Sequence, residues 1–259
     1  MKEFFLEKTY LPANEGYAMF SIKYFAILLL MLLIGTASLV FFSRQEEKRK
    51  EKLCRVFALV PAGMEILKFI ILFSQGVYTP NYYPIGFCSL VTYIFPVYAF
   101  AKNRTVRNVA RGLICMAMLP SGLLALLFPN WIGHYRFLSY FSLHSYLWHL
   151  LMVVYPFWTW LKDRDRLRTI NLIQGAIVFS PLIPIIVVIN RVFGTNYWFL
   201  VEPTDNHPFA SLYQVGGGGV YFAVLVILGY AVAGIFITLQ NYFIPRWIQA
   251  ERGHDHEKN

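Results

Sequence analysis

Six uncharged apolar runs constrain this chain more than any other feature of its sequence. A helix of about 20 apolar residues is long enough to cross the roughly 30 Å hydrocarbon core of a bilayer. The runs are Tyr24–Phe42, Ile85–Ala101, Gly112–Phe128, Phe137–Leu161, Ile170–Ile189 and Val220–Thr238. The sequence therefore predicts an all-α polytopic membrane protein.

Composition supports lipid as the solvent of this chain. Hydrophobic residues make up 57% of the 259 residues and charged residues only 14%, against about 25% charged in an ordinary soluble domain. One water-soluble core could not bury such an apolar surplus. The three cysteines are too few and too scattered for a disulfide framework or a zinc site, and we expect neither a metal nor a cofactor.

A seventh run, Val56–Phe73, has the length of a span but contains Glu65 and Lys68. Charged side chains are costly inside a bilayer and therefore indicate function when they occur there. We count this run as a span because the charges of the loops alternate between the two sides only when it is included. The expected fold is therefore a bundle of seven transmembrane helices.

Basic residues set the expected orientation of this bundle. Segments 44–55, 102–111, 162–168 and 246–258 carry seventeen Lys and Arg, whereas the segments on the other side carry five. The positive-inside rule then places the N-terminus outside and the C-terminus in the cytoplasm. The net charge of +9 orients the helices and needs no nucleic-acid partner. The expected division is an extracytoplasmic segment 1–23, a single membrane domain 24–244 and a cytoplasmic tail 245–259.

Three local features qualify this pattern. The first run could instead be a cleaved signal peptide, because small residues follow its apolar stretch at Gly35–Ser38. It continues to Phe42, however, and 23 residues of mixed charge precede it, which favours a span. Pro181 and Pro184 should bend the sixth span, and Gly216–Gly219 predicts a flexible loop before the seventh.

The unusual polar residues gather in the outer half of the predicted bundle. A helical rise of 1.5 Å per residue places there two charged residues, two histidines and one thiol: Glu65, Lys68, His144, His149 and Cys88. Asn190 and Asn196 lie in the outer loop after the sixth span. Structural readings stay open, because Glu65 and Lys68 could simply pair on one helix face and His149 could bond to a neighbouring helix.

Cys88 is the only thiol predicted to face the outer half, because Cys54 and Cys115 lie near the cytoplasmic side. A thiol with a histidine at similar depth is the minimum for nucleophilic acyl transfer, in which the imidazole takes the proton and the thiolate attacks an ester. From these residues alone the signal for such chemistry is weak.

Four sequence elements carry a resemblance to a known family. They are Pro84–Leu90 (PIGFCSL), Pro120–Pro129 (PSGLLALLFP), Arg136–His144 (RFLSYFSLH) and Asn190–Leu200 (NRVFGTNYWFL) with Pro203 after it. In this order they resemble the YwaF and transmembrane protein 164 family of seven-span membrane proteins. The likeness covers roughly residues 50 to 240.

The resemblance implies an activity as well as a fold. The eukaryotic branch of the family is understood as acyltransferases that move fatty acyl groups between phospholipids through a cysteine acting with a histidine. By this resemblance Cys88 is the nucleophile, His144 the general base, and Asn190 and Asn196 part of a polar cluster. Many relatives carry a histidine two residues before the cysteine, where this chain has Gly86, which puts the identity of the base in doubt.

The expected function is therefore that of a lipid acyltransferase whose partners are membrane lipids and an acyl-lipid substrate. A second hypothesis is a small-solute transporter or ligand sensor that uses the same outer pocket without covalent chemistry. A third is a structural or assembly protein without pocket chemistry. Short loops, and a single glycosylation sequon on the cytoplasmic side at Asn103, favour a bacterial plasma membrane.

Overall fold

A computed structural model describes residues 2–12, 16–163, 169–203 and 210–256, and in these ranges the chain forms helices and connecting segments without a strand. The main helices are α1 (Ile22–Ser43), α2 (Glu47–Ser74), α3 (Val91–Phe100), α4 (Arg104–Leu113), α5 (Leu119–Leu127), α6 (Tyr140–Asp163), α7 (Thr169–Phe179), α8 (Leu182–Phe193) and α9 (Ala210–His256). A π-helical turn, Ile114–Met118, joins α4 to α5.

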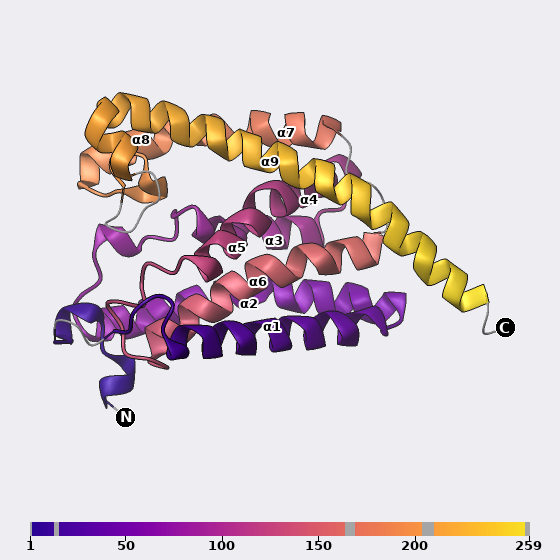
Figure 1. Ribbon diagram of the computed structural model, residues 1–259, viewed down its shortest axis with the longest axis horizontal. Helices are drawn as coiled ribbons and strands as arrows, with labels where there is room; N and C mark the ends of the chain where they lie inside the picture. The colour runs from indigo at the N-terminus through magenta and orange to yellow at the C-terminus, as the bar shows by residue number, and fades with distance from the viewer. Residues whose placement is uncertain (1, 13–15, 164–168, 204–209, 257–259) are drawn as a thin grey trace.

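The helices run back and forth between two ends of an elongated bundle (Figure 1). α1 packs against α6, α2 packs against α3 and α6, and α5 packs against α6. α4 packs against α7, and α9 crosses the π-helical turn. The N-terminal segment lies at one end, which we call the N-terminal end. The turns from α1 to α2 and from α3 to α4 lie at the opposite end, which we call the basic end.

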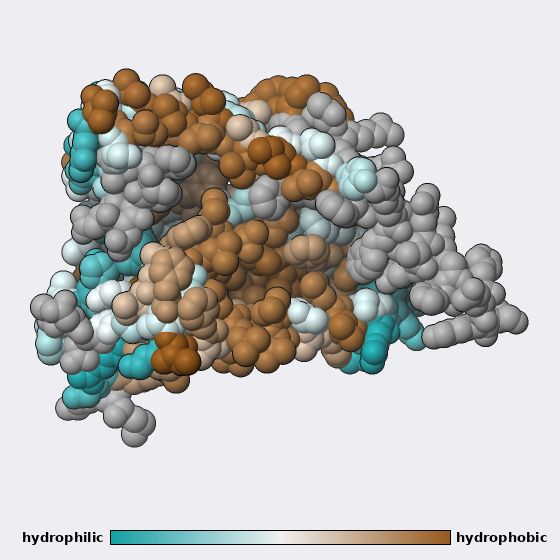
Figure 2. Space-filling view, in the orientation of Figure 1, coloured by the Kyte–Doolittle hydropathy of each residue, from teal (hydrophilic) through white to brown (hydrophobic). Residues whose placement is uncertain are grey.

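Five helical segments of the described chain are long and apolar enough to cross a membrane. They are Ile22–Ser43, Glu47–Ser74, Arg104–Leu127, Ile173–Phe193 and Ser211–Ile235. The run with Glu65 and Lys68 is thus one of the five, as expected. Cys88–Phe100 is a shorter apolar helix, and α6 has 24 residues but carries many histidine, serine, tyrosine and tryptophan side chains. Apolar side chains cover the middle of the bundle, with polar ones towards both ends (Figure 2).

Proline and glycine decide where two of the helical segments begin or break. The run Ile85–Ala101, the third predicted span, was expected to begin at Ile85, but its first helical turn is the 3₁₀ turn Cys88–Leu90. The run Ile170–Ile189, the sixth predicted span, breaks between α7 and α8 at Ser180 and Pro181, because proline has no N–H to continue the ladder of hydrogen bonds. The bend expected in this run is therefore confirmed.

The prediction of a loop at Gly216–Gly219 is wrong. These glycines lie inside α9, where Gly217 has a φ of 68° and kinks the helix. Glycine accepts such a left-handed backbone without steric cost, so the run bends a helix instead of ending it. α9 also continues to His256, through most of the tail expected at 245–259. Of the basic segments, residues 164–168 and 257–259 lie outside the described residues.

Close aromatic packing and small residues hold the bundle together. Trp158 of α6 stacks on Phe42 of α1 with centroids 4.4 Å apart, and Tyr155 stacks on Phe95 of α3 at 4.2 Å. A Cβ on Gly122 would stand only 2.6 Å from Cβ of Met152. Only glycine allows α5 and α6 to approach this closely, as small residues do at membrane helix interfaces.

The N-terminal segment covers one end of the bundle through a buried carboxylate. Glu7 accepts hydrogen bonds from the backbone N–H of Thr9 (2.7 Å), from its hydroxyl (2.6 Å) and from the Tyr82 hydroxyl. Its own N–H donates to the side chain of Gln75 at 3.0 Å. Burial by itself would raise the pKa of Glu7, but the bonds from Thr9 and Tyr82 and the charge of Lys8 outweigh burial and lower it.

Candidate functional site

Cys88 begins the 3₁₀ turn that leads into α3. Pro84 and Gly86 precede it and keep the segment from Pro84 to Phe87 out of a regular helix. Cys88 is half-buried and its thiol is free. Its backbone carbonyl accepts a hydrogen bond of 3.2 Å from the indole Nε1 of Trp148 on α6. The α3 and α6 helices thus meet at the residue expected to be the nucleophile.

His144 lies in the second turn of α6, one helical turn before Trp148. The two rings are nearly parallel, with centroids 5.4 Å apart and 20° between the planes. The His144 ring also lies against Tyr140 at 5.7 Å and near the backbone carbonyl of Met64 on α2. Its Nε2 is buried, and no described residue, the neighbouring Met64 backbone included, gives it a hydrogen bond of regular geometry.

The structure brings Cys88 and His144 to the same indole without joining them. Trp148 contacts both, but no hydrogen bond between the Cys88 thiol and the His144 ring occurs among the described residues. Catalytic hydrogen bonds are often long in a ligand-free site and tighten around substrate. The arrangement is therefore compatible with a nucleophile and base that require a substrate between them.

Glu65 and Lys68 form a buried ion pair on α2 beside this cluster. Nζ of Lys68 lies 2.6 and 2.8 Å from the two carboxylate oxygens of Glu65, and both side chains are at most 15% exposed. Lys68 is also an electrostatic neighbour of His144. The ion pair predicted as one reading of these residues does form, and it adjoins the candidate base.

The charge of Glu65 acts on several tyrosine hydroxyls in its neighbourhood. Its electrostatic neighbours include four of them, on α3, on α6 and in two connecting segments: Tyr93, Tyr140, Tyr78 and Tyr197. The hydroxyl of Tyr140 is buried without a hydrogen-bond partner among the described residues. We call Glu65, Lys68, Tyr140, His144, Trp148 and Cys88 the outer cluster, after the side of the membrane on which the sequence predicts them. The cluster holds two of the buried side-chain atoms without a hydrogen-bond partner among the described residues, the Tyr140 hydroxyl and Nε2 of His144, and a ligand could supply the missing partners.

His149 lies apart from the outer cluster on a different face of α6. Its Nδ1 is 2.7 Å from the backbone carbonyl oxygen of Ser145, and its ring stacks on Trp131 at 4.9 Å with 8° between the planes. Residues five apart on a helix point about 140° away from each other, so His144 and His149 face different neighbours.

Asn190 and Asn196 use their side chains to shape the loop after α8. Asn190 accepts bonds from the Tyr197 N–H (2.7 Å) and the Thr195 hydroxyl (2.9 Å), and its amide donates to the Tyr197 carbonyl (3.0 Å). Asn196 bonds in the same way to the backbone of Val201 and Glu202. Neither hydrogen-bonds to Cys88, so the structure does not place them as donors at the nucleophile. The neighbouring Asp205, Asn206 and His207 lie outside the described residues.

Trp148 and Tyr140 were not among the residues expected at the site, although both lie four residues from His144 on α6. Side chains at this spacing share a helix face, so the pattern could have identified them. Trp198, which donates to the backbone carbonyl of Ile85 at 2.9 Å, could not have been found this way. More than a hundred residues separate these partners, and no local pattern connects them.

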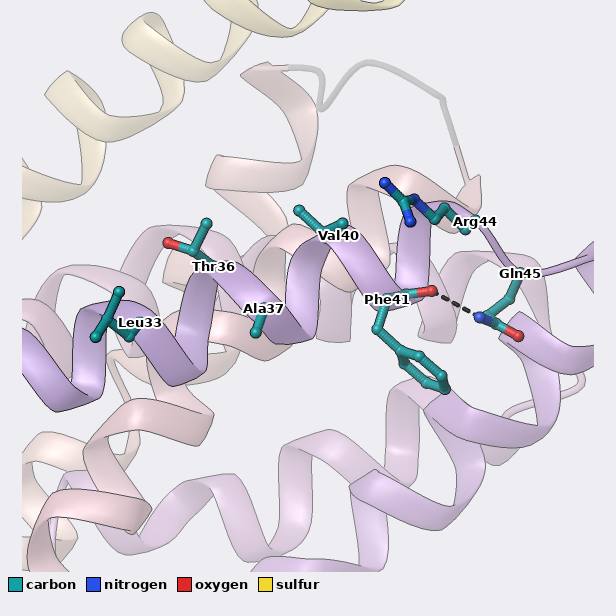
Figure 3. A pocket seen from close by; sticks show the side chains of 7 residues that line it. All are labelled: Leu33, Thr36, Ala37, Val40, Phe41, Arg44 and Gln45. Carbon is teal, nitrogen blue, oxygen red and sulfur yellow. Dashed lines mark hydrogen bonds between the residues drawn. The ribbon is translucent and has the colours of Figure 1, made fainter.

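An open groove lies elsewhere, along the exposed face of α1 (Figure 3). It has a volume of about 510 Å³ and is lined by Leu33, Thr36, Ala37, Val40, Phe41, Arg44 and Gln45. None of these residues belongs to the outer cluster. The groove therefore adds nothing to the chemistry around Cys88.

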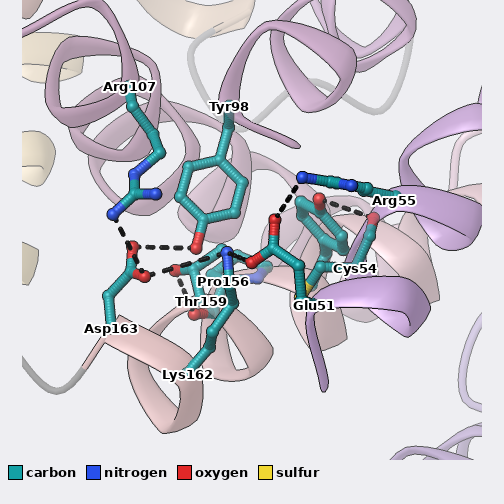
Figure 4. A network of polar contacts seen from close by, with 10 residues as sticks. Glu51, Cys54, Arg55, Tyr98, Arg107, Pro156, Thr159, Lys162 and Asp163 are labelled. Atoms are coloured by element: carbon teal, nitrogen blue, oxygen red, sulfur yellow. Dashed lines mark hydrogen bonds and ion pairs between the residues drawn. The ribbon is translucent and has the colours of Figure 1, made fainter. Parts of the chain in front are cut away.

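The basic end of the bundle carries a second polar cluster (Figure 4). Lys162 lies 2.6 Å from Glu51 and 3.9 Å from Asp163. Asp163 also accepts a bond of 2.9 Å from the Tyr98 hydroxyl and pairs with Arg107 at 3.7 Å. These contacts, which we call the basic-end cluster, connect α2, α3, α4 and α6.

Within the described residues no group of three or more His, Cys, Asp or Glu could hold a metal ion. The helices and the outer cluster together define an integral, polytopic membrane protein with a buried polar site near one end. The family model of the TMEM164 family matches residues 19–238, and the chain belongs to that family. The match includes every residue of the outer cluster, whereas Glu7 precedes it. No curated protein and no solved structure matches this chain.

Proposed function

We propose that this protein is a membrane acyltransferase that moves a fatty acyl group between phospholipids through a thioester on Cys88. The observation that carries the proposal is the meeting of Cys88 and His144 on Trp148, with Nε2 of His144 buried and unpartnered. An unpartnered imidazole nitrogen next to a thiol can accept the thiol proton.

The reaction has two balanced halves. In the first, Nε2 of His144 takes the Cys88 proton and the thiolate attacks the ester carbonyl of the donor lipid. The ester C–O bond then breaks, a thioester forms and the lysolipid oxygen takes the proton from His144. In the second, a lysolipid hydroxyl gives its proton to His144 and attacks the thioester, and the departing Cys88 thiolate recovers that proton.

The ion pair would hold the head of the lipid. Lys68 carries the positive charge that a lipid phosphate requires, and Glu65 orients Lys68 through both carboxylate oxygens. The tyrosines around Glu65 would present phenol groups to the remaining polar atoms of the headgroup. Asn190 and Asn196 would contribute by shaping the loop, because their amides are bonded to its backbone.

We further propose that all seven helical segments cross the membrane, with the N-terminal end outside and the basic end in the cytoplasm of a bacterial cell. The alternation of basic loops supports this orientation. The membrane lipids of the outer leaflet would then be the partners of the outer cluster. Attachment of a membrane-impermeant thiol or amine reagent to single introduced residues at either end of the bundle would test it.

The test of the activity is a comparison of Cys88→Ala and Cys88→Ser with Cys115→Ala, in bilayer nanodiscs supplied with a labelled phospholipid and a lysophospholipid acceptor. Both Cys88 variants should lose transfer and the hydroxylamine-sensitive label on the protein. The Cys115 variant, whose thiol is buried near Thr159, should keep both. Full transfer by the two Cys88 variants would remove Cys88 as nucleophile.

Gly86 raises the question of whether a second base belongs in this site. A Cβ there would stand 3.4 Å from the Ser89 hydroxyl and 4.0 Å from the Tyr197 ring, which is ordinary van der Waals contact. A histidine side chain therefore has room to begin at this position. We expect Gly86→His to fold and, if the relatives' histidine is their working base, to transfer faster than the natural chain.

A transporter or sensor is the second candidate, favoured by the break between α7 and α8 at Ser180 and Pro181. Broken helices provide ion and solute sites in transporters. This function requires solute flux into proteoliposomes that is abolished by Glu65→Gln and unaffected by Cys88→Ser. The acyltransferase proposal predicts the opposite dependence on Cys88.

A further inference from the structure

The loop that follows α8 is built to hold a fixed shape. α8 ends at Gly194, whose φ of 62° turns the chain back. The side chain of Asn190 then bonds to both the N–H and the carbonyl of Tyr197, and Asn196 bonds to the backbone near Glu202. We call residues 194–202, together with Asn190 at the end of α8, the asparagine loop.

Two residues at the tip of the asparagine loop hold a backbone conformation that non-glycine residues avoid. Trp198 has a φ of 60° and Phe199 a φ of 54°. Such strain persists only where surrounding contacts enforce it, and it is concentrated at functional sites. The question is therefore what the strained Trp198 holds in place.

Trp198 reaches the segment immediately before Cys88. Its Nε1 donates to the carbonyl of Ile85 at 2.9 Å, and its ring packs on Phe87 with centroids 5.3 Å apart. The ring also stacks on Phe179 of α7 at 5.0 Å, and Phe179 in turn contacts Phe87 at 5.4 Å. Trp198 is thus held in a three-ring cluster with α7 and with a residue that directly precedes Cys88.

Tyr197 holds the same segment further upstream. Its hydroxyl donates to the backbone carbonyls of Pro80 and Tyr83. Both carbonyls also accept a local backbone bond, from the N–H of Tyr83 (3.2 Å) and of Ile85 (2.8 Å) respectively, so the Tyr197 hydroxyl adds a long-range contact that restricts the conformations this segment can adopt. On the other side, the indole of Trp148 holds the carbonyl of Cys88 itself. Two indoles from different parts of the chain therefore bond to backbone carbonyls three residues apart: Trp198 to Ile85 and Trp148 to Cys88.

We propose that Trp198 is a positioning residue for Cys88, which it orients through the Ile85 carbonyl and the Phe87 ring. It touches neither the thiol nor a substrate, and its effect reaches Cys88 through the two residues between. Asn190 and Asn196 serve this function indirectly, because they impose the loop shape that Trp198 requires. The inference rests on the proposed function for the role of Cys88 as nucleophile. That Trp198 orients the Cys88 thiol is a separate claim, which holds whether or not the protein transfers acyl groups.

The test is the rate at which N-ethylmaleimide alkylates Cys88, measured by mass spectrometry of its peptide in the intact protein in nanodiscs. Trp198→Phe keeps a ring and removes the N–H. Loss of one buried hydrogen bond changes the equilibrium between the held and the released turn by roughly fivefold to tenfold. We therefore expect faster alkylation of Cys88, because the turn is released. For acyl transfer, kcat should fall by a similar factor while KM stays within about twofold.

Trp158→Phe is the matched control, because the indole N–H of Trp158 is buried without a hydrogen-bond partner among the described residues. Its alkylation rate and its transfer rate should stay within about twofold of the natural chain. Tyr197→Phe is the second variant, used if Trp198→Phe does not fold. It removes the two bonds to Pro80 and Tyr83 and should change alkylation in the same direction, by less.

The outcomes separate this inference from the proposed function. Alkylation at the natural rate in both Trp198→Phe and Tyr197→Phe overturns the positioning role, whatever the activity. Faster alkylation in a protein that transfers no acyl group supports the positioning role and refutes the acyltransferase. An equal change in Trp158→Phe would show a general loosening of the bundle and would also overturn the inference.

Discussion

Two buried charge clusters lie at opposite ends of the same bundle and differ in how completely they are paired. In the basic-end cluster, both oxygens of Glu51 and both oxygens of Asp163 have partners on other residues. In the outer cluster, Glu65 and Lys68 bond only to each other within the described part of the chain. Beside them, the Tyr140 hydroxyl and Nε2 of His144 have no partner among the described residues, whereas in the basic-end cluster Nε of Arg107 is the one such atom.

The difference separates a structural role from a binding role. A cluster whose carboxylates are fully paired uses its hydrogen-bonding capacity to connect helices, and it gains rigidity. A cluster with unpartnered polar atoms is costly to bury, and that cost is recovered when a ligand supplies the missing partners. The predictions below separate these roles, in descending order of expected effect.

The largest effect is expected from breaking the ion pair of the outer cluster. Glu65→Gln leaves the Lys68 charge uncompensated in a buried position, which should cost about 3–5 kcal/mol in the free energy of unfolding. The double variant Glu65→Gln/Lys68→Met removes both charges and should regain most of that stability. Unfolding in mixed micelles and lipid transfer would be measured together.

The double variant also separates the two roles of the pair. If Lys68 binds a lipid phosphate, this variant is stable and inactive. A double variant with both natural stability and natural transfer would show that the pair serves only the fold.

A smaller effect is expected from Lys162→Met at the basic end. Glu51 keeps Arg55 as a partner, and Asp163 keeps Tyr98 and Arg107, so neither carboxylate is left alone. The free energy of unfolding should fall by about 1–3 kcal/mol. Transfer per folded molecule should not change, and a loss of transfer by the folded variant would contradict the structural role of this cluster.

His144→Phe should affect activity and stability in opposite ways. The substitution removes an unpartnered buried nitrogen, so the free energy of unfolding should stay level or rise by about 1 kcal/mol. Transfer should fall by about 10²-fold or more, as expected on loss of a general base. His149→Phe is the matched control and should keep transfer, because its ring lies on Trp131; loss of transfer in that variant would bring His149 into the site.

The smallest effect concerns Glu7, outside both clusters. Its pKa is lowered in the folded chain, so the stability that it contributes is present above its unfolded pKa of about 4.5. That stability is lost as the pH falls through the lower, folded value. Glu7→Gln should therefore flatten the acid side of a plot of melting temperature against pH. Glu3→Gln, at an exposed carboxylate, should leave the plot unchanged.

The membrane fold could be predicted from local patterns because each helix is set by its own residues. Apolar runs of sufficient length form helices at the expected places. The sixth predicted span breaks at Pro181, because proline has no N–H to donate to the helical hydrogen bonds. The prediction of a loop at Gly216–Gly219 was wrong because glycine is compatible with a loop and with a kinked helix. Which of the two forms depends on what packs around it.

The candidate site was only half predictable. Sequence depth alone brought Glu65, Lys68, Cys88 and His144 to one end of the bundle, and the structure shows that Cys88 and His144 both contact Trp148, while Glu65 and Lys68 pair with each other. The predicted position of Asn190 and Asn196 along the membrane did not determine whether their amides face a substrate or their own loop. The hydrogen bonds show that they face the loop.

The sequence by itself determined that this chain belongs in a membrane, where its helices lie along the chain and which polar residues share one end. Periodicity, length and charge are local properties and suffice for that. Only the tertiary structure decided that Trp148 contacts both Cys88 and His144 and that Trp198 bonds to the segment before Cys88. Such contacts arise between α6, the asparagine loop and the start of α3, and their geometry is fixed by helix packing that no single segment encodes.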